Sequence, residues 1–190
     1  MASDSSLEKN HKRKVHQAAV ISWITVLVSD YLAVNHLPIP TPQSPILLHR
    51  IIFTTRMLVP TILPLLFGVA IIMKTRYTNY LTMGLNPVHS KGNYLLNMAN
   101  RYMHNTVEQM IIFIMLQYTL STLLSAEYLP IIPMNIFLFV ISRFMYFVGY
   151  MDEEGPVNRA YGFTLTLSLN IFSTFVCLFL LIIKGPTFDL

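Results

Sequence analysis

Long stretches of apolar residues dominate this chain. Only 12% of its 190 residues are charged, about half the fraction found in soluble domains. An α-helix crosses the hydrocarbon core of a bilayer with about 17–25 such residues. The sequence therefore predicts an all-α membrane protein built as one compact transmembrane domain. Polar or proline-containing connectors divide its apolar residues into five stretches, Val15–Val34, Ile46–Met73, Leu95–Leu124, Met134–Tyr150 and Asn158–Ile183.

The first stretch is expected to be a retained membrane helix. It follows a polar, basic N-terminus (1–14), but no small-x-small cleavage site ends it, as it would in a signal peptide. We expect an additional transmembrane helix at 15–34 and a four-helix transmembrane domain at 46–184. Pro60 and Pro64 are expected to bend the second stretch.

Basic residues predict the orientation, because loops on the cytosolic side of a membrane hold more lysine and arginine. The basic N-terminus is placed in the cytosol, and successive helices then cross the membrane in alternating directions. This puts most basic residues on the cytosolic side, with Arg50 and Arg56 as exceptions. The net charge of +4 is scattered over helix ends, so it does not predict nucleic-acid binding. Cys177 is the single cysteine, which excludes an intrachain disulfide or a thiolate metal site. The residues placed on the cytosolic side are Lys9, Lys12, Arg13, Lys14, Lys74, Arg76, Lys91, Arg101 and Arg159.

Two side chains of opposite charge, Glu108 and Arg143, lie within the apolar stretches. An unpaired charge at this depth costs about 3 kcal/mol on insertion scales. Glu108 lies seven residues inward from Arg101, and Arg143 lies seven inward from Tyr150, so each is about 10 Å below its helix end. Because the two helices are antiparallel neighbours, we expect an intramembrane ion pair. A structural clamp alone is an equally good interpretation of such a pair.

Further polar residues share the helical faces of this expected pair. Arg101, Asn105 and Glu108 are spaced by four and three residues, which places them on one face of a helix. Arginine binds carboxylates and can stabilise a thiolate. Asparagine can hydrogen-bond an amide group, and tyrosine offers a hydroxyl at the apolar boundary. The pattern predicts a cation-rich mouth, open to the cytosol, for a small polyanion with amide character. Arg101 could instead be a membrane anchor, and Tyr146 and Tyr150 could be aromatic-belt residues.

The segment Arg101-Tyr-Met-His-Asn105-Thr-Val-Glu108 resembles the Arg-x-x-x-Asn-x-x-Glu signature of the MAPEG superfamily, the membrane-associated proteins in eicosanoid and glutathione metabolism. Arg143, Tyr150 and Arg159 are similar to that family's third-helix arginine and tyrosine and to the arginine that opens its fourth helix. The resemblance covers about Met57 to Ile183. It implies a four-helix transmembrane bundle preceded by one extra helix.

The resemblance also implies a function. It implies a homotrimer with glutathione bound between subunits and a lipophilic small molecule or lipid as second substrate, in a glutathione transferase or peroxidase reaction. Arg159 would be the catalytic residue, beside the thiol. It further implies an integral protein of the endoplasmic reticulum or of Golgi and endolysosomal membranes. The implied cofactor-binding residues are Arg101, Asn105, Glu108, Arg143 and Tyr150, with Arg143 paired to Glu108.

The sequences of three segments also resemble the mattrin branch of MAPEG-like proteins. These segments are Asn105–Gln109, Ser142–Tyr146 and Tyr161–Leu165. This second resemblance implies a non-enzymatic regulator of membrane trafficking or receptor maturation. An anion or lipid transporter is the less favoured class, because the sequence has neither a pair of broken helices nor an inverted repeat.

Overall fold

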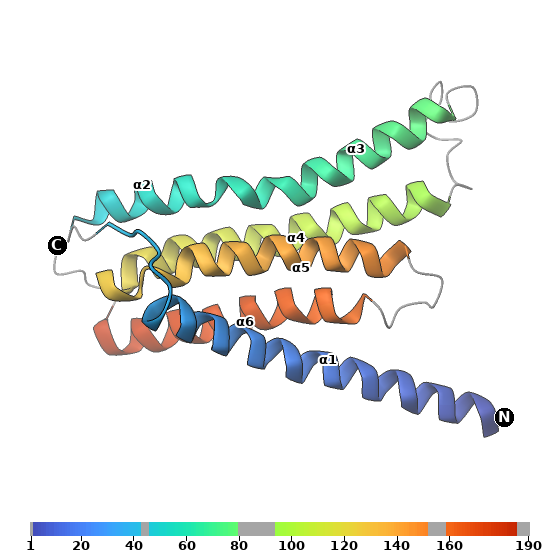
Figure 1. The fold of residues 1–190 in the computed structure, drawn as a ribbon, viewed down its shortest axis with the longest axis horizontal. Coiled ribbons are helices and arrows are strands. Elements are labelled where there is room, and N and C mark those ends of the chain that lie inside the picture. Colours follow the sequence, from blue (N-terminus) through green and yellow to red (C-terminus); the bar gives the residue numbers. More distant parts are fainter. Residues whose placement is uncertain (1, 43–45, 80–93, 152–158, 186–190) are drawn as a thin grey trace.

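The fold consists of long helices that run along one axis (Figure 1). The computed structural model describes residues 2–42, 46–79, 94–151 and 159–185. Lys91 and the acidic segment 152–154 lie outside this range. The described helices are α1 (Ala2–Asn35), α2 (Leu47–Met57), the 3₁₀ turn η1 (Val59–Ile62), α3 (Leu63–Thr78), α4 (Tyr94–Leu123), the 3₁₀ turn η4 (Ala126–Tyr128), α5 (Ile131–Met151) and α6 (Ala160–Lys184).

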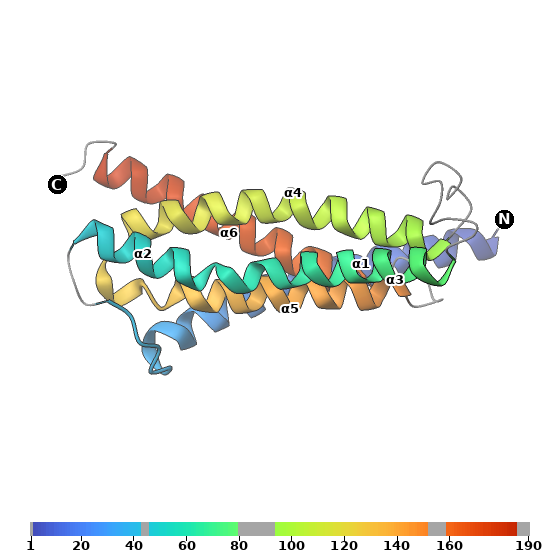
Figure 2. The same cartoon turned by 90° about the horizontal axis from the view of Figure 1, so that it is seen from above.

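Helices α4, α5 and α6 form the centre of the bundle. The arm made of α2, η1 and α3 packs on α4 and α5 from one side, and α1 packs on α6 and α5 from the other (Figure 1). In the turned view, α6 crosses α4 and α5 obliquely (Figure 2). The main core joins α4, α5 and α6 through side chains such as Phe113, Phe139 and Leu169. This arrangement brings the C-terminal end of α3, the N-terminal end of α4, the C-terminal end of α5 and the N-terminal end of α6 to one end of the bundle.

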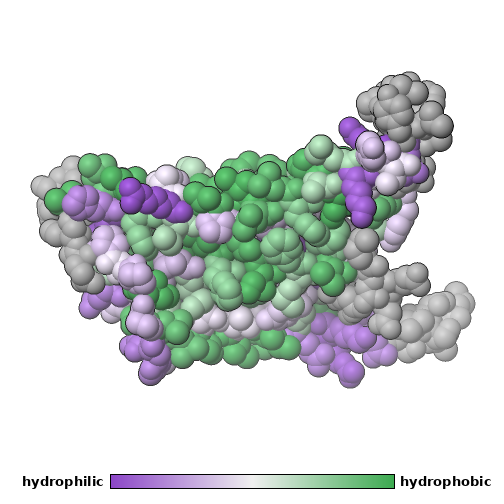
Figure 3. Space-filling view, turned by 45° about the horizontal axis from the view of Figure 1, so that its top comes forward, coloured by the Kyte–Doolittle hydropathy of each residue, from purple (hydrophilic) through white to green (hydrophobic). Residues whose placement is uncertain are grey.

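Hydrophobic side chains cover the outside of the bundle. Figure 3 shows a hydrophobic band across the middle of one face, with hydrophilic residues gathered toward its two ends. Among the described residues, four segments are long and apolar enough to cross a membrane, namely Lys9–Asn35, Leu47–Thr78, Ala126–Tyr150 and Ala160–Ile183. Helix α4 is not one of them, because glutamine, threonine and charged residues interrupt its apolar sequence. The chain is therefore an integral membrane protein, and the predicted all-α class is confirmed.

The second apolar stretch is broken where its prolines predict. Pro60 is the second residue of η1 and Pro64 is the second residue of α3, and the arm passes from α-helix to a 3₁₀ turn and back. Proline has no amide hydrogen and cannot continue the α-helical hydrogen-bond pattern. The carbonyl of Leu58 accepts both the backbone N–H of Thr61 at 3.0 Å and the Thr61 hydroxyl at 2.6 Å, which holds the 3₁₀ turn. Two helices extend beyond the predicted apolar stretches, since α1 begins at Ala2 and α3 continues to Thr78.

A stripe of small and polar side chains holds α1 against the centre of the bundle. Ser22, Val26, Asp30 and Ala33 are buried at helical spacing. The hydroxyls of Ser22 and Thr164 lie 2.9 Å apart, and those of Thr25 and Tyr161 lie 3.1 Å apart. Small and hydroxyl-bearing residues let helices approach closely in a membrane. Helix α1 is therefore packed tightly onto α6.

Arg50, one of the two exceptions to the charge pattern, hydrogen-bonds a carbonyl at the C-terminal end of α4. Its Nη1 atom donates to the carbonyl of Leu124, directly after α4, at 2.6 Å. Carbonyls at a helix C-terminus lack intrahelical donors, and a cation there also interacts favourably with the helix dipole. We expect Arg50→Met to lower the free energy of unfolding by about 1–2 kcal/mol. Thermal unfolding in detergent measures this change, and exposed Arg56→Met is the matched control. Equal losses in the two variants would contradict this assignment.

Candidate functional site

Arg143 lies at the centre of a polar cluster inside the bundle. Its side chain is fully buried between α4, α5 and α6. Nη1 donates to Asn105 Oδ1 at 2.9 Å, and Nη2 donates to the carbonyl of Gly162 at 3.3 Å and to the Thr166 hydroxyl. That hydroxyl also lies 2.6 Å from the hydroxyl of Ser142. Neutral oxygens, rather than a carboxylate, therefore hold this guanidinium.

The expected ion pair between Glu108 and Arg143 is wrong for this chain. Among the described residues, Arg143 bonds to the partners just named, whereas Glu108 is exposed on α4. The physical reason is helical rotation. Tyr102, Thr106 and Phe113 turn the opposite side of α4 into the core. Glu108 lies about 60° farther from the core direction than Asn105, because three residues turn a helix by about 300°.

Two tyrosine rings connect Arg143 to Arg159 at the end of the bundle. The Arg143 Cζ atom lies 4.9 Å from the ring centroid of Tyr146. The hydroxyls of Tyr146 and Tyr150 lie 3.3 Å apart, and the Arg159 Cζ atom lies 4.5 Å from the ring centroid of Tyr150. Cations in such positions are attracted to the electron-rich face of the ring. Four of the six predicted residues, Asn105, Arg143, Tyr150 and Arg159, thus belong to one connected row.

A cavity of about 310 Å³ opens beside this row. Among the described residues that line it, Arg159 is the cationic group and none carries a carboxylate. The phenol groups of Tyr146 and Tyr150 supply polar edges within an otherwise apolar wall. The described lining residues are Val15, Tyr146, Tyr150, Arg159, Ala160, Phe163 and Thr164. The cavity therefore suits an anionic ligand with an apolar part.

The predicted residues on α4 divide between two environments. Asn105 is half-buried and reaches Arg143, which joins it to the inner row. Arg101 and Glu108 are exposed and do not line the cavity. The outer side of α4 continues as exposed apolar residues, including Ile111 (57% exposed) and Met115 (66%). Within one chain, the six predicted residues therefore do not surround one space.

Three residues of the site were not predicted from the sequence. Thr166 bonds Arg143, Gly162 supplies a carbonyl, and Tyr146 lies between Arg143 and Tyr150, with its ring edge-to-face to that of Tyr150. A threonine or glycine in an apolar helix carries no signal by itself. Their spacing of four residues on α6 could have indicated a common face. Tyr146 was placed on the right face but was interpreted as a residue of the aromatic belt.

The chemistry that this arrangement supports is anion binding and thiolate stabilisation. The Arg159 guanidinium lines the cavity, and the Arg143 guanidinium is buried behind it. A cation attracts an anion more strongly where the dielectric constant is low. Within the described part of the chain, no group of three or more histidine, cysteine, aspartate or glutamate side chains could hold a metal ion.

Comparison with known proteins agrees with the arrangement of helices and polar residues. The family model described as the MAPEG family matches residues 52–179, which include most of α2 and extend through most of α6. Helix α1 lies ahead of the matched residues. A search of curated proteins and a search of solved structures gave no match. Because the family model covers more than half of the chain, this protein belongs to the MAPEG family.

Proposed function

We propose that this protein binds glutathione in the cavity beside Tyr150 and Arg159 and promotes its reaction with a lipophilic electrophile. The observation that carries the proposal is the row from Asn105 through Arg143, Tyr146 and Tyr150 to Arg159. It ends at a cavity to which the described part of the chain contributes a cation, Arg159. Membership in a family of glutathione and eicosanoid metabolism supports the choice of ligand.

The cavity residues fit glutathione in charge and size. Glutathione has two carboxylates and one ammonium group at neutral pH, so it suits a cavity whose charged lining residue is Arg159. A volume of about 310 Å³ lies at the lower end of the range for small-molecule sites. Tyr146 and Tyr150 offer hydroxyls to polar groups of a peptide. Asn105, through its bond to Arg143, fixes the position of the buried charge behind them.

Arg159 is the proposed catalytic residue. When bound, glutathione supplies a thiol whose deprotonated form is the nucleophile. The Arg159 guanidinium lowers the free energy of a nearby anion, and its contact with the Tyr150 ring holds it at the start of α6. The apolar wall formed by Val15 and Phe163 keeps water from the reacting groups and admits an apolar partner from the bilayer. A glutathione transferase or peroxidase reaction fits these features.

A homotrimer would bring Arg101 and Glu108 to the site. Glu108 is exposed on α4, and its side of the helix continues toward the middle of the bundle with apolar residues, Ile112 at 47% exposure and Met115 at 66%. An exposed carboxylate facing lipid is costly. We propose that this side of α4 packs against the next subunit and faces its cavity, so that glutathione lies between two chains. The subunits would lie in endoplasmic reticulum, Golgi or endolysosomal membranes with the basic end of the bundle in the cytosol.

Arg159→Ala tests the function directly. We expect glutathione to raise the unfolding temperature of the detergent-solubilised wild type, and we expect the variant to lose most of this effect. Losing one charge-assisted hydrogen bond corresponds to about tenfold or more in affinity. Conjugation of 1-chloro-2,4-dinitrobenzene, followed by absorbance, measures turnover in the same samples.

The matched control for this test is Arg56→Ala, which removes an exposed arginine that lines a different cavity. It should bind glutathione and turn over like the wild type. Equal glutathione stabilisation of the wild type and Arg159→Ala would remove Arg159 from the site. Absence of stabilisation in the wild type would overturn the ligand assignment itself.

The second candidate is a non-enzymatic regulator of membrane trafficking or receptor maturation. The observation in its favour is that Val15, from the helix outside the family match, lines the same cavity as Arg159. A helix placed there can make access to the cavity depend on the position of α1. Glutathione binding with no conjugation of any electrophile tested, and no peroxide reduction, would favour this candidate.

A further inference from the structure

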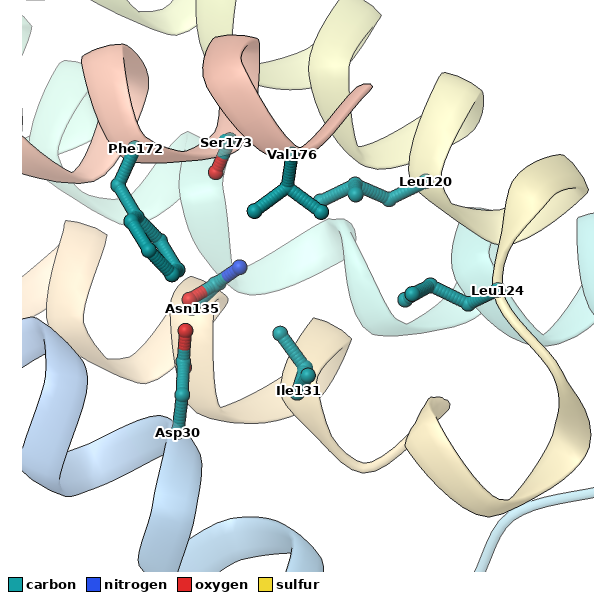
Figure 4. Close-up of a pocket in the computed structure, with 8 residues that line it drawn as sticks. All are labelled: Asp30, Leu120, Leu124, Ile131, Asn135, Phe172, Ser173 and Val176. Atoms are coloured by element: carbon teal, nitrogen blue, oxygen red, sulfur yellow. The ribbon is translucent and has the colours of Figure 1, made fainter. Parts of the chain in front are cut away.

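Asp30 places an acidic side chain inside the bundle, beside a small cavity between α1, α4, α5 and α6. The residue is 7% exposed, and the cavity has a volume of about 100 Å³ (Figure 4). Apolar side chains such as Leu120 and Phe172 form most of the cavity wall. Both carboxyl oxygens of Asp30 are buried, and neither has a hydrogen-bond partner in the described part of the chain. The carboxyl group must therefore be satisfied from within the protein.

No described side chain brings a positive charge to this carboxyl group. Among the described residues that line the cavity, Asp30 alone is titratable. The titratable side chains nearest to the lining residues along each helix, and Arg50 of α2, contact other partners. These pairs are Tyr31 with His36, Tyr118 with Thr55, Arg143 with Asn105, Cys177 with the carbonyl of Leu116 and Arg50 with the carbonyl of Leu124. In a medium of low dielectric constant, an ionised carboxylate with neither a cation nor a donor is so unfavourable that the group binds a proton instead.

Asn135 presents a hydrogen-bond acceptor to this carboxyl group. The carboxyl group of Asp30 and the amide oxygen of Asn135 point toward each other (Figure 4). The amide nitrogen of Asn135 is used elsewhere, since Nδ2 donates to Gln117 Oε1 at 3.5 Å. Asn135 Oδ1 is buried and has no donor in the described part of the chain. A carboxylic acid, unlike a carboxylate, has one hydrogen to donate. Protonation of Asp30 thus supplies the donor that these facing oxygens lack.

We propose that Asp30 is a proton-binding site that holds its proton at neutral pH, and that its O–H group donates to Asn135 Oδ1. The bound proton removes the negative charge from the interior of the bundle. It also forms a hydrogen bond between α1, which carries Asp30, and α5, which carries Asn135. A hydrogen bond shielded from water is stronger than one in water, because the surrounding dielectric constant is low. The protonated side chain therefore fastens the extra helix to the central helices.

Proton binding at Asp30 couples the packing of α1 to pH. The hydroxyl contacts of Ser22 and Thr25 hold α1 nearer its other end and do not depend on pH in this range. An aspartate in water ionises above about pH 4, whereas the packed Asp30 keeps its proton. The unfolded chain therefore binds fewer protons than the folded chain, and the folded chain loses stability as the pH rises above about 4. Low pH favours the packed position of α1.

Infrared spectroscopy of the purified full chain, in a detergent without carbonyl groups, tests the proposal. A protonated carboxylic acid has a C=O stretching band at higher frequency than the amide bands, and an ionised carboxylate has none there. The wild type should show this band at pH 7, where carboxyl groups in water are ionised. Incorporation of ¹³C-labelled aspartate should lower its frequency. The other aspartates, Asp4, Asp152 and Asp189, lie outside the apolar stretches. Absence of the band at pH 7 would mean that Asp30 is ionised, and would overturn the proposal.

Variants assign the band and the pH effect to Asp30. Asp30→Asn should lose the band, and its amide N–H can donate to Asn135 Oδ1 at any pH. The unfolding temperature of the wild type, relative to Asp30→Asn, should fall by about 4 °C per unit between about pH 5 and 7. Glu127→Gln is the matched control, because it removes an exposed carboxylate and should keep both the band and the pH effect. A difference between wild type and Asp30→Asn that stays constant with pH would refute the coupling.

Asn135→Leu tests the acceptor. Without Asn135 Oδ1, the O–H group of Asp30 loses its hydrogen bond, so the C=O band should move to higher frequency. An unshifted band would exclude Asn135 as the partner. If Asp30→Asn does not fold, the ¹³C shift in the wild type still decides whether an aspartate holds a proton at pH 7.

Discussion

Replacing Arg143 with alanine is expected to lower the free energy of unfolding by about 3 kcal/mol or more. The side chain is fully buried, and its removal leaves a cavity between three helices. It also leaves Asn105 Oδ1 and the Gly162 carbonyl without the donors that now serve them. A loss of this size lowers the unfolding temperature of a chain of 150–250 residues by about 6–12 °C. Differential scanning fluorimetry in detergent measures the shift.

Arg101→Ala is the matched control for Arg143→Ala. It removes the same side chain from α4 at a position that is exposed. Surface substitutions of this kind change stability by about 0.5 kcal/mol or less. Glutathione binding is expected to fall in both variants, but only the first should unfold early. Similar unfolding temperatures for the two variants would show that the buried cluster around Arg143 contributes little to stability.

Gly162→Ala is expected to be the most damaging single-methyl change in the described part of the bundle. A Cβ atom at Gly162 would lie 2.3 Å from the backbone nitrogen of Tyr146 and 2.7 Å from the carbonyl oxygen of Ser142. Both neighbours are backbone atoms of α5, so α5 and α6 must move apart to admit the methyl group. Overpacking of this kind costs about 1–3 kcal/mol. The shift would also pull the Gly162 carbonyl away from Arg143, so glutathione stabilisation should weaken as well.

Gly68→Ala provides the control for Gly162→Ala. A Cβ atom there would lie 2.3 Å from the sulfur of Met103, which is the flexible part of a side chain. Met103 can adopt another rotamer, and alanine is favoured over glycine within a helix by about 1 kcal/mol. The unfolding temperature should change little. An unfolding temperature for Gly162→Ala as high as that of Gly68→Ala would contradict the close contact of α5 and α6.

Features that depend on position along the chain could be predicted from the sequence. Helix α4 runs from Tyr94 to Leu123, against a predicted stretch of Leu95–Leu124. The break at Pro60 and Pro64 was also predicted, because proline removes a donor wherever it occurs. The charge pattern correctly placed Arg101 and Arg159 at the same end of the bundle. Length and hydropathy are local properties, so tertiary contacts do not change them.

Features that depend on rotation about a helix axis could not be predicted. The sequence places Glu108 and Arg143 at similar depth, but packing of Tyr102 and Phe113 decides which side of α4 faces inward. Asn105 then becomes the partner of Arg143, and Glu108 faces outward. Asp30 lies near the end of the first predicted apolar stretch, Val15–Val34. Its burial depends on α1 lying against α5 and α6, which no local pattern encodes.

The hydroxyl contacts along α1 matter for whether residues 52–179, which match the family, can be stable in a membrane without α1. Thr164, Asn135 and Ser173 are buried beneath or beside α1. A polypeptide shortened to the matched residues would present a ladder of polar groups to acyl chains on one flank of α6. Lipid cannot hydrate such a flank, so water or another polypeptide would have to cover it. In this protein the leading helix therefore acts as an intramolecular shield for its own bundle.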